Sequence, residues 1–201
     1  MDNGTLYITG IDKADALLNR DGTALLIGML LDQQVPMEWA FTGPYTIKQR
    51  LGHLNPSRIG AMDPEEFVSI CAEKPAIHRF PASMARRIHE LCAIVGAEYK
   101  NKGANIWSGV SEADELYKRL RVLPGYGDEK ARIFIALLAK RFGIKPKGWE
   151  KVAAPFSDKN FRTVADITSP ETLLKVRAWK KAEKAADLDK QGRPLKKAKT
   201  K

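Results

Sequence analysis

The chain has 201 residues, of which 44% are apolar and 29% charged, with a formal net charge of +10 and a pI near 9.6. This composition excludes a disordered chain, and the lack of any apolar run of about 18 residues excludes a helical membrane protein. The positive charge favours a polyanionic partner, although a general surplus for solubility is the alternative. Because the amino terminus lacks a basic segment followed by an apolar one, we expect a cytoplasmic protein that is not secreted.

The cysteines and histidines do not form a metal-site pattern. Cys71 and Cys92 lie inside helical patterns, and neither belongs to a CxxC or Cys/His cluster. Zinc and iron–sulfur sites depend on such spacing. We therefore expect two reduced core thiols, with no metal and no cofactor.

The first part of the chain predicts a buried central helix with a polar end. A short strand over Thr5–Thr9 and an amphipathic helix over Asp12–Asn19 come first. The stretch ALLIGMLL, which begins at Ala24, is apolar on all sides, as is typical of a helix at the centre of a domain. It ends in Asp32-Gln33-Gln34. Because polar side chains do not stay unpaired in a core, we expect this turn to reach a cleft; solvated glutamines after a helix are the alternative.

Three more helices are predicted before the middle of the chain. After Gly43-Pro44, the segment YTIKQRL predicts a short helix that ends at Gly52. Asp63, followed by Pro64, has the pattern of an N-cap for a helix that ends near Lys74. A long amphipathic helix over 84–99 leaves two arginines outward, either as phosphate contacts or as ordinary surface residues: Arg86 and Arg87.

Two amphipathic helices then meet at the turn Pro124-Gly125-Tyr126-Gly127. Ser111 and Asp114 have the spacing of a capping box, which predicts a helix that Pro124 ends. A second helix, predicted over 131–142, has its apolar residues at helical spacing. Because glycine accepts positive φ and close backbone contacts, the amides of this turn would face outward at a helix N-terminus, where a phosphate binds well. The alternative is an ordinary αα-hairpin with a glycine turn.

The remainder of the chain begins with an apparent insertion. Residues 144–156 are rich in Pro, Gly and Lys, and Asp158 follows them in SDKNFRTV. Ser169 and Pro170 have the pattern of a start for the final helix, which we expect to end near Leu188. Residues 189–201 hold six Lys or Arg against one Asp, which predicts a disordered basic tail.

The run from Leu123 to Ala131, LPGYGDEKA, resembles the helix-hairpin-helix of the HhH-GPD superfamily of base excision DNA glycosylases. Endonuclease III-like and 3-methyladenine glycosylase-like enzymes belong to this superfamily. The resemblance covers about 23–164 and implies an all-α, two-lobed fold over 1–188. The first lobe would span about 23–110, and the second would comprise 111–188 together with the N-terminal segment.

The resemblance also implies which residues meet DNA. Gln33 or Gln34 would fill or flank the gap that an extruded nucleotide leaves in the duplex. The hairpin would hold the phosphate backbone through its own backbone, without regard to base identity. The implied DNA-binding residues are Leu123, Pro124, Gly125, Tyr126, Gly127, Glu129, Lys130, Gln33, Gln34, Arg86 and Arg87.

In this superfamily an aspartate beyond the hairpin, in a segment resembling VDxHVxRV, stabilises the positive charge that develops on the sugar or helps to activate water. At the customary separation this chain has the insertion instead. The resemblance implies Asp158 as the catalytic carboxylate, with Phe161 and Val164 in the apolar places of the motif. A helix N-cap is its alternative role, and Asp166 and Asp32 are the reserve candidates.

Two departures from the pattern bear on the reaction. Bifunctional members carry a nucleophilic lysine at the position that Glu129 occupies here, and Lys130 falls on another face of the helix. The loop that binds an iron–sulfur cluster in some members is missing as well. These departures imply a monofunctional enzyme or a relative that has lost catalysis.

We therefore expect a DNA glycosylase that hydrolyses the N-glycosidic bond of a damaged or mismatched base in double-stranded DNA. It would act as a monomer, associated with the nucleoid and with no membrane. The alternative is a non-catalytic DNA-binding protein that uses the same hairpin to hold duplex or damaged DNA. An RNA-binding or protein-interaction module is disfavoured because the sequence has no internal repeat.

Overall fold

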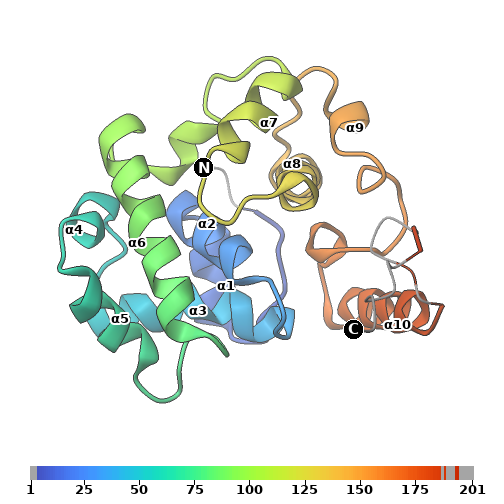
Figure 1. Cartoon of the computed structure of the whole chain (residues 1–201). Helices are drawn as coiled ribbons and strands as arrows, with labels where there is room; N and C mark the ends of the chain where they lie inside the picture. Colours follow the sequence, from blue (N-terminus) through green and yellow to red (C-terminus); the bar gives the residue numbers. More distant parts are fainter. Residues whose placement is uncertain (1–3, 187, 189–192, 195–201) are drawn as a thin grey trace, which may run out of the picture.

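The computed structural model describes residues 4–186, 188, 193 and 194, and these residues form helices and turns but no strand. The all-α fold class is therefore confirmed (Figure 1). The α-helices, in chain order, are α1 (Asp12–Leu18), α2 (Gly22–Leu31), α3 (Met37–Leu51), α4 (Pro56–Gly60), α5 (Pro64–Ala72), α6 (Pro81–Glu98), α7 (Ala113–Arg121), α8 (Asp128–Phe142), α9 (Trp149–Val152) and α10 (Pro170–Ala185). Two short 3-10 helices, η1 (Gly103–Ile106) and η2 (Val164–Asp166), lie between them.

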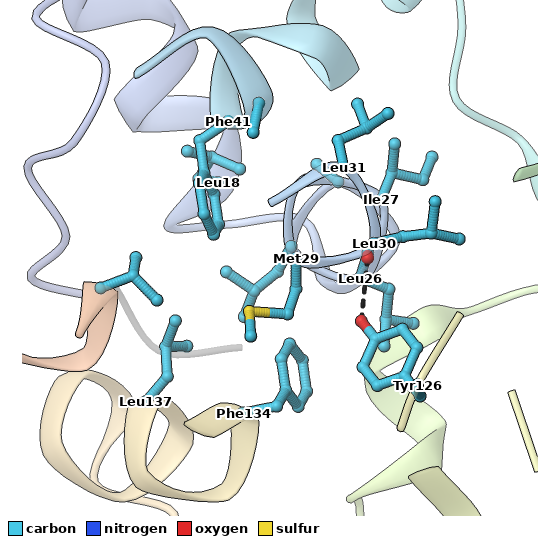
Figure 2. Packing of buried hydrophobic residues seen from close by; sticks show 14 of the residues in the cluster. Leu18, Leu26, Ile27, Met29, Leu30, Leu31, Phe41, Tyr126, Phe134 and Leu137 are labelled. Atoms are coloured by element: carbon cyan, nitrogen blue, oxygen red, sulfur yellow. Dashed lines mark hydrogen bonds between the residues drawn. The ribbon is translucent and has the colours of Figure 1, made fainter. Parts of the chain in front are cut away.

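Helix α2 is the centre of the core, as its apolar sequence predicts. All ten of its residues are buried. Figure 2 looks along α2 and shows Phe41 and Leu18 to its left, with Met29 below it facing Phe134 of α8. Burying a Leu, Ile, Met or Phe side chain stabilises a fold by about 1.5–3 kcal/mol. The burial of α2 therefore fixes the position of the polar turn that follows it, Asp32-Gln33-Gln34.

The remaining helices form two groups around α2. Helices α4 and α5 pack against α6, whereas α7, α9 and η2 pack against α8 (Figure 1). The N-terminal segment joins the second group, because the Thr5 amide donates to the Arg141 carbonyl at 3.2 Å. The division into two lobes stays a prediction.

The predicted strand over Thr5–Thr9 is wrong. No strand of the described chain lies beside this segment, and side chains bind its backbone instead. The Asn19 amide group bonds both the amide and the carbonyl of Leu6, and Asp15 accepts from the amides of Ile8 and Thr9. The segment is extended because helix α1 provides these polar partners.

The helix predicted over 45–51 is present and ends before Gly52, but its predicted start after Gly43-Pro44 is wrong, because α3 runs without a break from Met37 to Leu51 with Pro44 inside it. Proline removes one helical hydrogen bond and usually ends a helix. Here tight packing on α2 compensates, because a Cβ on Gly43 would lie 2.3 Å from Cδ1 of Leu31. Both Gly43 and Pro44 are buried in this contact.

The capping box predicted at Ser111 and Asp114 does not form, since α7 begins at Ala113 after Glu112. The Ser111 carbonyl accepts the Lys147 amide at 2.7 Å, and the Ala113 amide donates to the Lys147 carbonyl at 2.9 Å. This short parallel bridge holds the residues before α7 in an extended conformation. The segment 144–156 therefore docks against the start of the hairpin.

Two predicted N-caps are confirmed. Asp63 accepts from the amides of Glu65 and Glu66 at the start of α5, and Ser169 accepts from the Thr172 amide at the start of α10. The predicted tail, 189–201, lies outside the described residues apart from 193 and 194. Among the described helices, none is long and apolar enough to span a membrane.

Candidate nucleic-acid interface

The hairpin between α7 and α8 is fastened to the core by its own side chains. Gly125 has φ +77°, a left-handed conformation that favours glycine. Tyr126 is 2% exposed, and its hydroxyl donates to the Leu26 carbonyl of α2 at 2.8 Å (Figure 2). Leu123 is buried beside it. Leu123 and Tyr126 therefore position the turn and do not present their side chains to a ligand.

Unlike the backbone at Gly125, the backbone at Gly127 has a conformation that does not require a glycine. Its φ of −70° and ψ of 175° suit any residue, and Gly127 precedes the fifteen-residue helix α8 as the N-cap. In the described part of the chain, a Cβ on Gly127 would meet only Nη1 of Arg121, at 3.9 Å. Packing therefore does not demand a glycine at 127. Its small size instead leaves the N-terminus of α8 open to close approach from outside, as a phosphate requires.

The first turn of α8 meets the end of α2 at a single carbonyl. The Leu30 carbonyl accepts both Nζ of Lys130, at 2.7 Å, and Nε2 of Gln33, at 2.8 Å. This shared acceptor brings together the two segments that the sequence singled out, the hairpin and the glutamine turn. Glu129 occupies the same first turn of α8.

Gln33 and Gln34 have different roles in the glutamine turn. Gln33 is held inward, since Nε2 also lies 3.3 Å from Sδ of Met84 and its carbonyl contacts Nε2 of His78 at 2.9 Å. Gln34 is exposed and has φ +57°, an uncommon conformation for a residue other than glycine. Gln34 is therefore open to solvent, whereas Gln33 is tied to the core beneath it.

The two arginines of α6 also separate. Nη1 of Arg87 lies 3.5 Å from Oε1 of Gln33, and its Cδ is 3.9 Å from the position of a Cβ on Gly125. Arg87 thus lies between the glutamine turn and the hairpin. Arg86 instead forms a bidentate pair with Glu65 of α5, at 2.8 and 3.0 Å. We refer to Gln33, Gln34, Arg87 and the turn 124–127 as the hairpin face.

Residues that the predicted DNA-binding set leaves out lie at the edge of this face. His78 joins Gln33 to an aromatic cluster, with ring centroids 6.3 Å from Trp39 and 6.1 Å from Phe80. Phe80 is 44% exposed, and the Arg79 guanidinium lies 5.2 Å from its ring centroid. An exposed aromatic ring beside a cation suits stacking on a nucleobase. The HRF tripeptide was visible in the sequence, but its exposure depends on the packing of His78.

Asp158 and Asp166 lie together at the other end of α8. Nζ of Lys140 donates to Oδ1 of Asp166 and to the carbonyl of Asp158, both at 2.6 Å. Asp166 is buried, and its Oδ2 accepts the amides of Arg162 and Thr163 at 3.0 and 2.9 Å. Its carboxylate is therefore neutralised and saturated with donors.

Asp158 keeps more freedom than Asp166. Its side chain is 34% exposed and bonds Nε of Arg162 at 2.9 Å and the amide of Asn160 at 3.0 Å. No helix of the described chain begins here, so Asp158 does not act as the N-cap considered as its alternative. Both aspartates line a cavity of about 370 Å³, the carboxylate pocket, whose lining residues are Ala139, Lys140, Arg141, Lys145, Trp149, Ser157, Asp158, Lys159, Phe161 and Asp166.

The hairpin face and the carboxylate pocket lie at opposite ends of α8. Lys130 lies in the first turn of α8 and Lys140 in its last turn. Ten residues of α-helix correspond to about 15 Å along the axis. Asp32, the C-cap of α2, is the one candidate carboxylate placed at the hairpin end. The structure therefore divides the three candidate aspartates between two places.

A family model described as "HhH-GPD superfamily base excision DNA repair protein" matches residues 27–192. The chain belongs to this superfamily. Membership confirms the family expected from the hairpin, together with the class of enzyme, a DNA glycosylase, and DNA as its partner. No curated protein sequence matches the chain.

Solved structures similar to this HhH-GPD protein include three DNA-repair enzymes. A trapped covalent endonuclease III–DNA intermediate is 20% identical, with 86% of this chain and 68% of that chain covered and a TM-score of 0.43. The 3-methyladenine DNA glycosylase MagIII of H. pylori, bound to 1,N6-ethenoadenine, is 14% identical over 85% and 94%, with a TM-score of 0.47. A thermostable thymine-DNA glycosylase is 11% identical over 83% and 75%, with a TM-score of 0.41.

Proposed function

We propose that this HhH-GPD protein is a monofunctional, monomeric DNA glycosylase that hydrolyses the N-glycosidic bond of a damaged or mismatched base in duplex DNA. The observation that carries the proposal is the Leu30 carbonyl, which binds Lys130 of the hairpin helix and Gln33 of the glutamine turn at once. One rigid support thus holds both a phosphate-binding backbone and the turn whose exposed residue, Gln34, can enter the duplex.

The hairpin face supplies the contacts with DNA. A phosphate approaches the N-terminus of α8 over Gly127, with the Arg121 and Arg87 cations on either side of the turn. Gln34, exposed and in a left-handed conformation, enters the space of the extruded nucleotide, and Phe80 meets the neighbouring base. Extrusion costs a few kcal/mol of unstacking, which these contacts offset.

The reaction requires a carboxylate near the sugar. When the base leaves with the bonding electron pair, positive charge develops on the sugar. Water then adds to the sugar and gives up a proton, and the departing base takes up a proton. Each of Asp158 and Asp166 is paired with one cation, but Asp158 is partly exposed in a pocket large enough for a nucleoside, whereas Asp166 is buried. We therefore assign the stabilising carboxylate to Asp158. Asp32 is the competing candidate at the hairpin end.

The monofunctional assignment rests on Glu129 and Lys130. The position of the lyase nucleophile is a glutamate, which does not form a Schiff base with the sugar. Nζ of Lys130 donates to the Leu30 carbonyl, and an ammonium in that bond has no lone pair with which to attack. Hydrolysis, leaving an abasic site and an intact strand, is the expected outcome.

A second function is favoured by one observation. The carboxylate pocket lies about 15 Å along α8 from the hairpin, so a nucleotide extruded at the hairpin face has to travel that far to meet Asp158. A protein that holds duplex or damaged DNA at the hairpin face without excision has no such requirement. The two functions differ in a single measurable property, the release of a base.

The test is a panel of duplexes, each with one lesion or mismatch, incubated with protein and then treated with alkali to break abasic sites. We expect one or more substrates to break only after alkali. Asp158→Asn keeps the shape and hydrogen bonding of the side chain while removing its charge, and should slow excision at least 100-fold. Asp32→Asn is the matched variant at the hairpin end. Excision lost in Asp32→Asn and kept in Asp158→Asn would move the catalytic role to Asp32, and no excision at all would favour the binding protein.

A further inference from the structure

The carboxylate pocket has walls from three separate segments of the chain. The last turn of α8 contributes Lys140 and Arg141, the segment 157–166 contributes Lys159 and Phe161, and the insertion contributes Lys145 and Trp149. The insertion is therefore one side of a cavity of about 370 Å³, although it contributes no residue to the hairpin face. That volume lies within the range of small-molecule sites.

The pocket carries an excess of positive charge. Four cationic side chains and two carboxylates line it. Lys140 is paired with Asp166 at 2.6 Å, and Asp158 is paired at 2.9 Å with Arg162, which lies outside the lining. The other three cations, Arg141, Lys145 and Lys159, form no ion pair with any described residue. Like charges gathered around one cavity repel one another unless an anion lies between them.

Arg141 adds a second, independent observation. Its Nε–H is buried and has no hydrogen-bond acceptor among the described residues. Burial lowers the pKa of this guanidinium, which shows that its charge is poorly solvated, although the nearby Asp166 opposes the shift. Buried donors in native proteins nearly always have partners, so the Nε–H of Arg141 marks a place at the pocket wall where an acceptor oxygen would be bound favourably.

We propose that the carboxylate pocket binds a phosphate group, held by Arg141, Lys145 and Lys159. A phosphate offers several acceptor oxygens, which suit a guanidinium fork and two ammonium groups. Trp149 beside these cations provides an apolar wall for the rest of a nucleotide. The phosphate belongs either to a DNA strand or to a free mononucleotide. The insertion completes the site by contributing Lys145 and Trp149. The proposal does not depend on base excision.

Titration with inorganic phosphate and with dAMP, followed by calorimetry, tests this site directly. The double variant Lys145→Ala/Lys159→Ala removes two exposed side chains and leaves the core intact, and we expect it to weaken both ligands at least 10-fold. Lys151→Ala is the matched control, because Lys151 is an exposed lysine of α9 outside the pocket lining, and its binding should equal that of the wild type. Arg141→Lys, which keeps the charge but removes the Nε–H, should weaken binding by a smaller factor.

A competition arm identifies the source of the phosphate. If an undamaged duplex displaces dAMP, and the double variant reduces the salt slope of duplex binding by about 2, the ligand is a DNA phosphate. If the duplex does not compete, the ligand is a free nucleotide. The proposal is overturned if neither inorganic phosphate nor dAMP binds the wild type, or if the double variant and the Lys151→Ala control bind alike. None of these readouts requires excision, so they separate this site from the glycosylase activity.

Discussion

Replacing Gly127 by threonine should separate DNA binding from stability. The backbone of Gly127 is extended, and a Cβ there would have only Arg121 Nη1 within 4 Å, at 3.9 Å, in the described part of the chain. Threonine and glycine are about equal as N-caps, so we expect the free energy of unfolding to change by less than about 0.5 kcal/mol. The added methyl and hydroxyl groups would instead occupy the space through which a phosphate approaches the amides of α8.

The expected loss in affinity follows from the bonds removed. Hydrogen bonds to a charged group contribute about 1.5–3 kcal/mol, and losing that amount raises the dissociation constant by about 10- to 150-fold. Fluorescence anisotropy with a labelled duplex at fixed salt measures the affinity, and urea unfolding measures the stability. An unchanged affinity in Gly127→Thr would refute the assignment of this turn as the phosphate contact.

Gly125→Ala is the contrasting variant. Its φ of +77° is left-handed, and a residue with a Cβ pays about 1–2 kcal/mol there. A Cβ would also lie 3.4 Å from Cγ of Leu30, at the limit of ordinary contact. We therefore expect Gly125→Ala to lower stability, whereas Gly127→Thr should lower affinity alone. If both variants lost stability equally, the distinction between the two glycines would be wrong.

Three further predictions concern the chemistry, the core and the charge. Borohydride should trap no covalent protein–DNA adduct; an adduct that disappears in Lys130→Ala would show that this lysine, despite its bond to Leu30, is a nucleophile. Burial raises the pKa of the Cys71 thiol to about 12 and that of the Cys92 thiol further still. At pH 8 the thiolate fraction of Cys71 is then about 10⁻⁴, so a disulfide reagent should modify neither cysteine before the protein unfolds. Duplex binding through about 4 to 6 phosphates should weaken with salt at a log–log slope near −4 to −5, and a slope near zero would exclude an electrostatic interface.

The parts of the fold that local chemistry decides could be predicted from the sequence. Helix α2 is apolar on every side, and such a helix is stable only inside a core. Asp63 and Ser169 cap the helices that follow them because capping involves atoms two or three residues away. The parts that failed depend on distant partners. Pro44 stays within α3 because of its packing on α2. The segment at Thr5 does not pair as a strand because the side chains of Asn19 and Asp15 bind its backbone groups.

The site follows the same division. The hairpin could be predicted because its proline and two glycines fall within four residues and restrict the conformation of a single turn. The sequence could not show which of Arg86 and Arg87 lies at the hairpin face. That depends on Glu65 of α5, which forms an ion pair with Arg86 and holds it away from the hairpin. Gln33 and Gln34 differ because contacts with Leu30, Met84 and His78 hold Gln33 inward, whereas the positive φ of Gln34 accompanies an exposed side chain. The carboxylate pocket could not be predicted because its walls come from the end of α8, the insertion and the segment 157–166, which only the fold brings together.

The most direct test of the proposed activity is a count of free bases. After incubation with the lesion duplexes, mass spectrometry quantifies the released base, an aldehyde-reactive probe quantifies abasic sites, and electrophoresis without alkali quantifies strand breaks. A monofunctional glycosylase predicts equal amounts of free base and abasic sites with unbroken strands. Duplex bound at the hairpin face with no base released from any lesion would contradict that function.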